Sequence, residues 1–147
     1  MGTLSRFAEK LVFVDTMPCI YFIEEHPVYV EAVESFFVGA LRDKNYRLMT
    51  STMTLAEVLV QPYRKGDDFL VAEYEEIICN TDELLVVPID LITARKAAKL
   101  RADYSLKMPD ALQFAASLVN GADYFLTNDK EIAKTGLPQI VRFDDLL

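Results

Sequence analysis

Short apolar segments alternate with longer helical patterns along almost the whole chain, and this alternation restricts the fold more than any other feature. Five segments are expected to be strands: residues 11–14 (LVFV), 46–51 (YRLMTS), 83–87 (ELLVV), 122–127 (ADYFLT) and 139–143 (QIVRF). Helical patterns lie between them, at residues 28–42, 54–60, 68–79, 90–104, 109–119 and directly after Asp129. Because parallel strands need crossover connections, the sequence predicts an α/β fold with a mainly parallel five-stranded sheet and helices on both faces.

Prolines and small polar residues mark where several of these helices begin or end. Thr54 is expected to start a short helix that Pro62 ends, because proline lacks an amide proton and crowds the preceding turn. Asp90 is expected to cap the helix at 90–104. Small apolar residues should form the buried face of that helix: Leu91, Ala94, Ala98 and Ala102. Pro109 suits the start of the next helix.

Four carboxylates stand where predicted strands end or predicted helices begin. They are Asp15 in LVFVDT, Glu57 in TLAEVL, Asp110 in KMPDALQFAA and Asp129 in FLTNDK. They are 42, 53 and 19 residues apart along the chain (57−15, 110−57, 129−110), so only tertiary structure can bring them together. Ligands of open parallel sheets bind beyond the carboxyl ends of the strands. We therefore predict that the four side chains converge at this edge.

Each carboxylate also has a purely structural interpretation. Glu57 follows Thr54 at the spacing of a capping box. Asp110 suits the first turn of a helix, where the helix dipole favours negative charge, and Asp129 suits an N-cap. Asp15 is harder to explain in this way, because an unpaired carboxylate at the end of a buried strand is costly. Four independent caps have no reason to converge, so the set as a whole favours a functional site.

Carboxylate oxygens are the ligands that Mg²⁺ and Mn²⁺ prefer, and these ions usually keep several bound waters. Such an ion lowers the pKa of a bound water and stabilises negative charge on a phosphodiester. The single histidine, His26, lies in a polar turn, which disfavours Ser/His or Cys/His catalysis. Thr16, Thr127 and Asn128 flank the carboxylates and are candidates for supporting the cofactor, although local turn bonding explains them equally well.

The formal net charge of −8 at pH 7 argues against a protein that holds nucleic acid through a broad basic surface. It does not argue against a nuclease, because bound divalent cations would cancel much of the charge of the four carboxylates. Arg101 and Lys107 precede Asp110 and could contact a phosphate, although solvated charges are the simpler interpretation.

Length and composition indicate one globular domain. The chain has 147 residues, of which 52% are hydrophobic and 26% charged. No apolar run approaches the ~20 residues that cross a bilayer. The first residues lack the apolar core of a signal peptide, so a cytoplasmic protein that does not bind membranes is expected.

In their order and sequence these segments resemble the PIN-domain family, in particular bacterial toxins of the VapC type. The matching segments are FVDT at Asp15, TLAEVL at Glu57, LKMPDALQFAA at Asp110 and GADYFLTND at Asp129, and the resemblance extends from about residue 11 to the end. It implies a three-layer α/β/α fold and a Mg²⁺- or Mn²⁺-dependent ribonuclease that cuts RNA. It also implies that the four acids are both catalytic and metal-binding, with Thr127 as a supporting hydroxyl. The resemblance further implies that the protein forms a homodimer and is neutralised by a small antitoxin protein.

Two other functions are compatible with the same residues. A Mg²⁺-dependent receiver-type domain would accept a phosphoryl group on Asp15, although the sequence lacks an acidic pair beside that residue. A PIN-like module could instead bind RNA or a protein partner without cutting it. Metal affinity without turnover would identify such a module.

Overall fold

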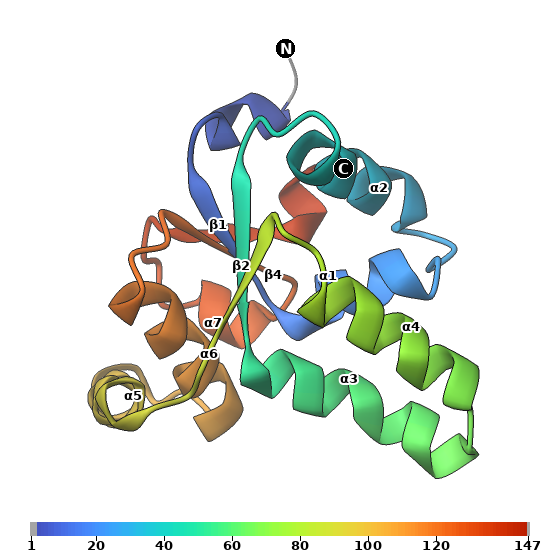
Figure 1. Ribbon diagram of the computed structural model, residues 1–147. Coiled ribbons are helices and arrows are strands. Elements are labelled where there is room, and N and C mark those ends of the chain that lie inside the picture. Colours follow the sequence, from blue (N-terminus) through green and yellow to red (C-terminus); the bar gives the residue numbers. More distant parts are fainter. Residues whose placement is uncertain (1–2, 147) are drawn as a thin grey trace.

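Five parallel strands form one sheet in the order β3-β2-β1-β4-β5 in the computed structural model, which describes residues 3–146 (Figure 1). The strands are β1 (Leu11–Val14), β2 (Arg47–Ser51), β3 (Leu84–Val87), β4 (Tyr124–Thr127) and β5 (Ile140–Arg142). The helices are α1 (Thr16–Ile23), α2 (Val30–Leu41), α3 (Thr52–Lys65), α4 (Asp68–Cys79), α5 (Leu91–Tyr104), α6 (Met108–Val119) and α7 (Lys130–Ala133), with 3-10 turns η1 (Thr3–Phe7) and η2 (Phe143–Leu146). The predicted α/β fold with a parallel five-stranded sheet is therefore confirmed.

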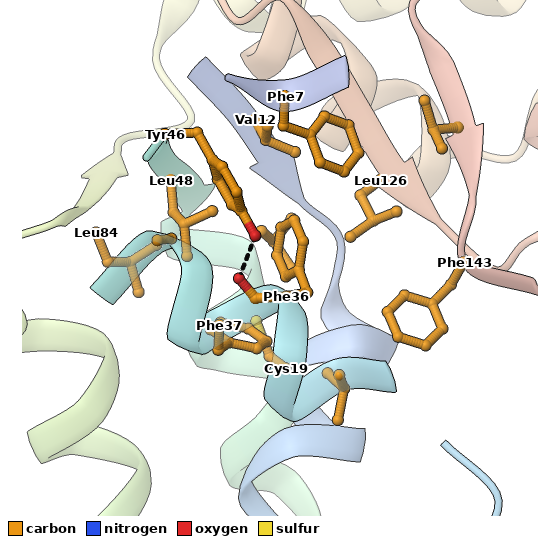
Figure 2. Close-up of a cluster of buried hydrophobic side chains, with 14 of the residues drawn as sticks. Phe7, Val12, Cys19, Phe36, Phe37, Tyr46, Leu48, Leu84, Leu126 and Phe143 are labelled. Carbon is orange, nitrogen blue, oxygen red and sulfur yellow. Dashed lines mark hydrogen bonds between the residues drawn. The ribbon is translucent and has the colours of Figure 1, made fainter. Parts of the chain in front are cut away.

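Successive strand residues face opposite sides of the sheet, so the central strand β1 contributes to two separate cores. Val12 and Val14 pack with side chains of α1 and α2, whereas Leu11 and Phe13 pack with side chains of α5 and α6. Figure 2 shows the first of these cores, where Val12 lies among aromatic rings contributed by η1, α2 and η2. Helices thus cover both faces of the sheet, which gives the expected three layers.

Helices α3 and α4 form a hairpin with a small core of its own, made by Val58, Leu59, Tyr74 and Ile78. The prediction that Pro62 ends the first of these helices is wrong, because α3 continues to Lys65 with Pro62 buried inside it. Proline removes one amide donor from the helix, but packing against α4 holds the last turn in place. The helix ends at Gly66, whose left-handed backbone (φ 64°) suits a residue without a side chain.

The buried face of α5 differs from the predicted one. Asp90 caps the helix as predicted, accepting hydrogen bonds from both the amide and the hydroxyl of Thr93. The buried side chains are Thr93, Ala97 and Leu100, whereas Leu91 is 72% exposed. Alanines are too small to define an apolar face in the sequence, so contact with α6 decides which side is covered.

Helix α1 lies outside the segments whose periodicity predicts a helix, although Pro18 suits a helix start. It is short and apolar along most of its length, so it lacks the three- and four-residue periodicity that reveals longer helices. Its first residue follows Asp15, and its position directly after β1 brings it to the edge of the sheet where the candidate site lies. Among residues 3–146, no helix is both long enough and apolar enough to span a bilayer.

Candidate active site

A cleft of about 290 Å³ opens at the edge where the strands end. It is lined by Asp15, Thr16, Met17, Tyr21, Glu57, Pro109, Asp110, Gln113, Asn128 and Asp129. All four predicted carboxylates are in this set, although they come from the end of β1, from α3, from α6 and from the turn after β4. The structure therefore brings together four acids that are far apart in sequence.

Asp15 lies at the centre of the site and uses both carboxylate oxygens. Its Oδ1 accepts a hydrogen bond from the amide of Thr16 at 2.9 Å, which caps α1. Its Oδ2 accepts one from the hydroxyl of Thr127 at 2.7 Å. Burial raises the pKa of Asp15, the two hydrogen bonds oppose that rise, and the charges of Glu57 and Asp129 add to it. The acid is thus a helix cap and a member of a crowded negative cluster at once.

Glu57 is held by a neighbouring element and takes no part in starting its own helix. The hydroxyl of Thr16 donates a hydrogen bond to Oε1 of Glu57 at 2.7 Å. The N-cap of α3 is Ser51, whose hydroxyl accepts from the amide of Met53. The capping-box interpretation of Thr54 and Glu57 is therefore wrong, and Thr16 connects two acids of the cleft.

Asp110 and Asp129 face each other across the cleft. Asp129 caps α7, because its Oδ1 accepts from the amide of Glu131 at 2.8 Å. Asp110 lies in the first turn of α6. Burial, the charges of Asp129 and Asp15 and a hydrogen bond with Asp129 together raise the pKa of Asp110 to about 7, against the opposing effect of Lys107. Negative charge in the cleft is therefore under-compensated by the protein itself.

Gln113 is part of the site although sequence reasoning did not select it. It is only 2% exposed, and its amide nitrogen donates to Thr54 Oγ1 at 2.7 Å, with longer contacts to Thr16 Oγ1 at 3.3 Å and Asp15 Oδ1 at 3.5 Å. Its amide oxygen accepts a hydrogen bond from Ser51. The sequence does carry one signal for this residue: Gln113 is a polar amide in a helix that is otherwise apolar nearly all round, so it must find hydrogen-bond partners in the interior.

The flanking residues predicted to support a cofactor have different surroundings. Thr16 and Thr127 each hydrogen-bond a carboxylate of the cleft, and Thr127 Oγ1 also accepts from the amide of Asp129 at 3.0 Å. Asn128 lines the cleft, but its amide nitrogen donates to the hydroxyls of Tyr21 and Tyr29 at 3.3 and 3.2 Å. Asn128 therefore braces the turn that presents Asp129.

The donor set fits a hard divalent cation. Within residues 3–146, no three His, Cys, Asp or Glu side chains are close enough to enclose a metal ion by themselves. Mg²⁺ does not need such a cage, since it is usually bound by one or two carboxylates together with water and substrate phosphates. Several carboxylates along an open cleft, with too little positive charge beside them, provide that kind of site.

Residues 12–137 match the family profile of the PIN domain. The chain belongs to the PIN domain family. None of the curated proteins compared with it matches its sequence. The PIN domain assignment thus rests on the family profile, and the solved structures below agree with it in fold.

Several solved structures share the fold of this PIN domain at low sequence identity. A toxin–antitoxin complex from Klebsiella pneumoniae is 21% identical, with a TM-score of 0.66 over 88% of this chain and 95% of the other. VapC20 from Mycobacterium tuberculosis, a toxin that cleaves the sarcin-ricin loop, is 16% identical, with a TM-score of 0.70 over 87% and 97%. VapBC2 from Rickettsia felis, bound to a DNA fragment from its promoter, is 17% identical, with a TM-score of 0.69 over 90% and 96%.

Proposed function

We propose that this PIN domain is a Mg²⁺- or Mn²⁺-dependent endoribonuclease that hydrolyses RNA phosphodiesters, and that it is the toxin of a toxin–antitoxin pair. The observation that supports this most strongly is the meeting of four carboxylates from four separate elements in one cleft. Membership of the PIN domain family supports the same reaction. We assign catalytic and metal-binding roles to Asp15, Glu57, Asp110 and Asp129.

The residues around the acids would hold them in position for this chemistry. A divalent cation bound there would supply a water of lowered pKa and neutralise charge on the scissile phosphate. Thr127 donates to Asp15 and so favours its ionised form, and Thr16 fixes the carboxylate of Glu57 by a second hydrogen bond. Asn128 would act indirectly, because its hydrogen bonds to Tyr21 and Tyr29 hold the turn before Asp129 in place.

We propose an antitoxin as the protein partner because two of the compared structures are toxin–antitoxin complexes. An arginine from such a partner would suit a cleft in which carboxylate charge is poorly compensated. From the same resemblance we also propose that the chain is a single PIN-like domain, that two chains form a homodimer, and that the protein is cytoplasmic.

Cleavage of a mixed RNA pool by the purified protein in Mg²⁺ or Mn²⁺ tests the proposal. We expect cutting with either ion, none in EDTA, and a loss of at least a hundredfold for Asp110→Asn. Asp82→Asn is the matched control, because Asp82 is an exposed aspartate in the turn before β3, at the opposite edge of the sheet.

Three outcomes would overturn the proposal. RNA cutting that persists in EDTA or in Asp110→Asn would place the activity outside the acidic cleft. Metal binding without cutting of any RNA would indicate a non-cleaving binding module, and labelling of Asp15 by a small phosphodonor would indicate a receiver-type domain.

A further inference from the structure

A second hollow is lined by residues of the same two segments that carry Asp110 and Asp129, and one of these residues, Lys107, is close enough to Asp110 for its charge to lower the pKa of that acid. This groove, of about 440 Å³, is lined on one side by residues 104–107 and on the other by Glu131, Lys134 and Thr135. Lys107 stands three residues before Asp110, and Glu131 stands two residues after Asp129. The groove therefore lies between the α5–α6 connection and α7, beside the segments that present Asp110 and Asp129 (Figure 1, where α5, α6 and α7 lie on the opposite side of the view from α3 and α4).

The charge of the groove is opposite to that of the cleft. Its lining includes two lysines, Lys107 and Lys134, and one carboxylate, Glu131, in a chain whose net charge is −8. Lys134 and Glu131 form an ion pair at 3.0 Å in which both side chains are mostly exposed. Exposed pairs of this kind contribute little, so a phosphate can replace the carboxylate as the partner of Lys134. The groove thus offers two cations to an anionic chain near the acidic cleft.

An aromatic ring and hydroxyl groups accompany the lysines. Tyr104, on the last turn of α5, lines the groove and is 40% exposed. Proteins that bind single-stranded nucleic acid combine cations along the backbone with aromatic rings on which bases stack. Ser105 and Thr135 add hydroxyls of the kind that contact phosphate and sugar oxygens.

We propose that this groove binds the single-stranded RNA segment next to the scissile phosphate, with its phosphates on Lys107 and Lys134 and one unpaired base stacked on Tyr104. The inference rests on the proposed ribonuclease function, because it takes the acidic cleft to be the place where the phosphodiester is cut. It assigns substrate grip to a short cationic path, which explains how a strongly acidic protein holds a polyanion without a broad basic surface.

RNA fits this groove better than an acidic protein segment does. Two separated lysines match a repeating phosphate backbone, and an exposed ring beside them matches an unpaired base. An acidic segment would supply carboxylates for the lysines but no base to stack on Tyr104. The same experiment distinguishes the two ligands.

Fluorescence anisotropy with a labelled single-stranded RNA of mixed sequence tests the proposal. All variants carry Asp110→Asn, so that the RNA stays intact, and Mg²⁺ is present throughout. We expect Lys107→Gln and Lys134→Gln each to weaken binding several-fold and to reduce the slope of log Kd against log salt by about 0.7. Tyr104→Leu should weaken binding about tenfold with little change in that slope, and should leave binding of a double-stranded RNA unaltered.

Lys65→Gln and Tyr63→Leu are matched controls, because both residues are exposed near the end of α3, away from the groove. They should leave affinity and salt slope unchanged, and circular dichroism should show that all variants fold.

Normal affinity and slope in the groove variants would overturn the groove assignment while leaving the ribonuclease proposal standing. Weaker binding of polyglutamate with unchanged RNA binding would identify an acidic protein segment as the ligand and overturn it as well. The ribonuclease proposal is judged separately, by cleavage with the wild-type chain.

Discussion

Asp15 illustrates how one side chain can be both structural and reactive. Its Oδ1 accepts the hydrogen bond that caps α1, and its Oδ2 accepts one from the hydroxyl of Thr127. Both oxygens of this partly buried carboxylate therefore have a hydrogen-bond donor. Both hydrogen bonds favour the ionised acid, whereas burial and two neighbouring carboxylates oppose it. A strand-end aspartate in this position can therefore be tolerated in the metal-free protein and remain available to a cation.

The stability of the metal-free protein should fall as the pH rises from about 4 to 7. The folded-state pKa of Asp110 is about 7, well above the ordinary aspartate value of about 3.9, so the folded state binds more protons between these values. Stabilisation from this group is fully present below pH ~4 and is lost as the pH passes through 7. The raised pKa of Asp15 acts in the same direction.

Urea unfolding in EDTA across this pH range measures the effect. The Asp110→Asn variant should show a clearly smaller fall, with part of the slope left because of Asp15. An unchanged slope in the variant would show that Asp110 is not the group responsible.

At the level of elements, Gln113 joins three helices at the site. It reaches from α6 to Thr54 of α3 and Thr16 of α1, so the acids of different elements are held in one arrangement. Replacing this amide by leucine keeps the volume similar but leaves the hydroxyl of Ser51 without its acceptor and removes one of the donors to Thr54 Oγ1, which the hydroxyl of Thr50 still reaches. Gln113 is a positioning residue in this interpretation.

Gln113→Leu should lower stability by about 1–3 kcal/mol, the usual cost of leaving buried polar groups unpaired. Cleavage should fall further than the folded fraction does, and the metal concentration that gives half-maximal cleavage should rise. Gln61→Leu, at an exposed position of α3, is the control. Loss of stability with an unchanged metal requirement would make the role of Gln113 purely structural.

Close contact between α2 and the start of β2 explains a second element-level requirement. A Cβ added to Gly39 would lie 2.6 Å from the hydroxyl of Tyr46. That tyrosine is buried and donates to the carbonyl of Phe36 (Figure 2), so it cannot move away freely.

Gly39→Ala should therefore destabilise the protein by about 1–3 kcal/mol, since the overpacking outweighs the gain of ~1 kcal/mol in helix propensity. Adding Tyr46→Phe removes the closest atom and should recover part of the loss, as a double-mutant cycle by thermal unfolding would show. If the two substitutions proved additive, the contact would not be the cause.

At the scale of the whole molecule, a net charge of −8 is combined with a cleft that gathers four acids. Self-repulsion of this kind opposes compact structure, and a divalent cation in the cleft would relieve it where it is strongest. The cationic groove beside the cleft is small by comparison, so the molecule should interact with polyanions only locally.

Mn²⁺ at about 100 times its Kd should therefore stabilise the protein by about 2.7 kcal/mol, through binding to the folded state alone. Differential scanning calorimetry should show a raised Tm for the wild-type chain and little change for an Asp15→Asn/Asp110→Asn double variant. NaCl at matched ionic strength is the control for general screening. An equal rise with NaCl would mean that no specific cation site exists.

The sequence alone determined the class of fold and the positions of the four acids along it. Strand–helix alternation is a local pattern, and the need of parallel strands for crossovers turns it into an architecture. Helix boundaries with strong signals, such as Asp90 and the end of α6 at Asn120, were also predictable because capping is local.

Only the tertiary structure decided how those parts combine. The covered face of α5, the passage of α3 through Pro62 and the connecting role of Gln113 all depend on which helix packs against which, because packing outweighs weak local preferences. Likewise, the hydrogen bond from Thr16 to Glu57 joins residues that are 41 positions apart. The sequence placed each acid at the end of a strand or the start of a helix; the order of the strands in the sheet brought the four acids to a single cleft.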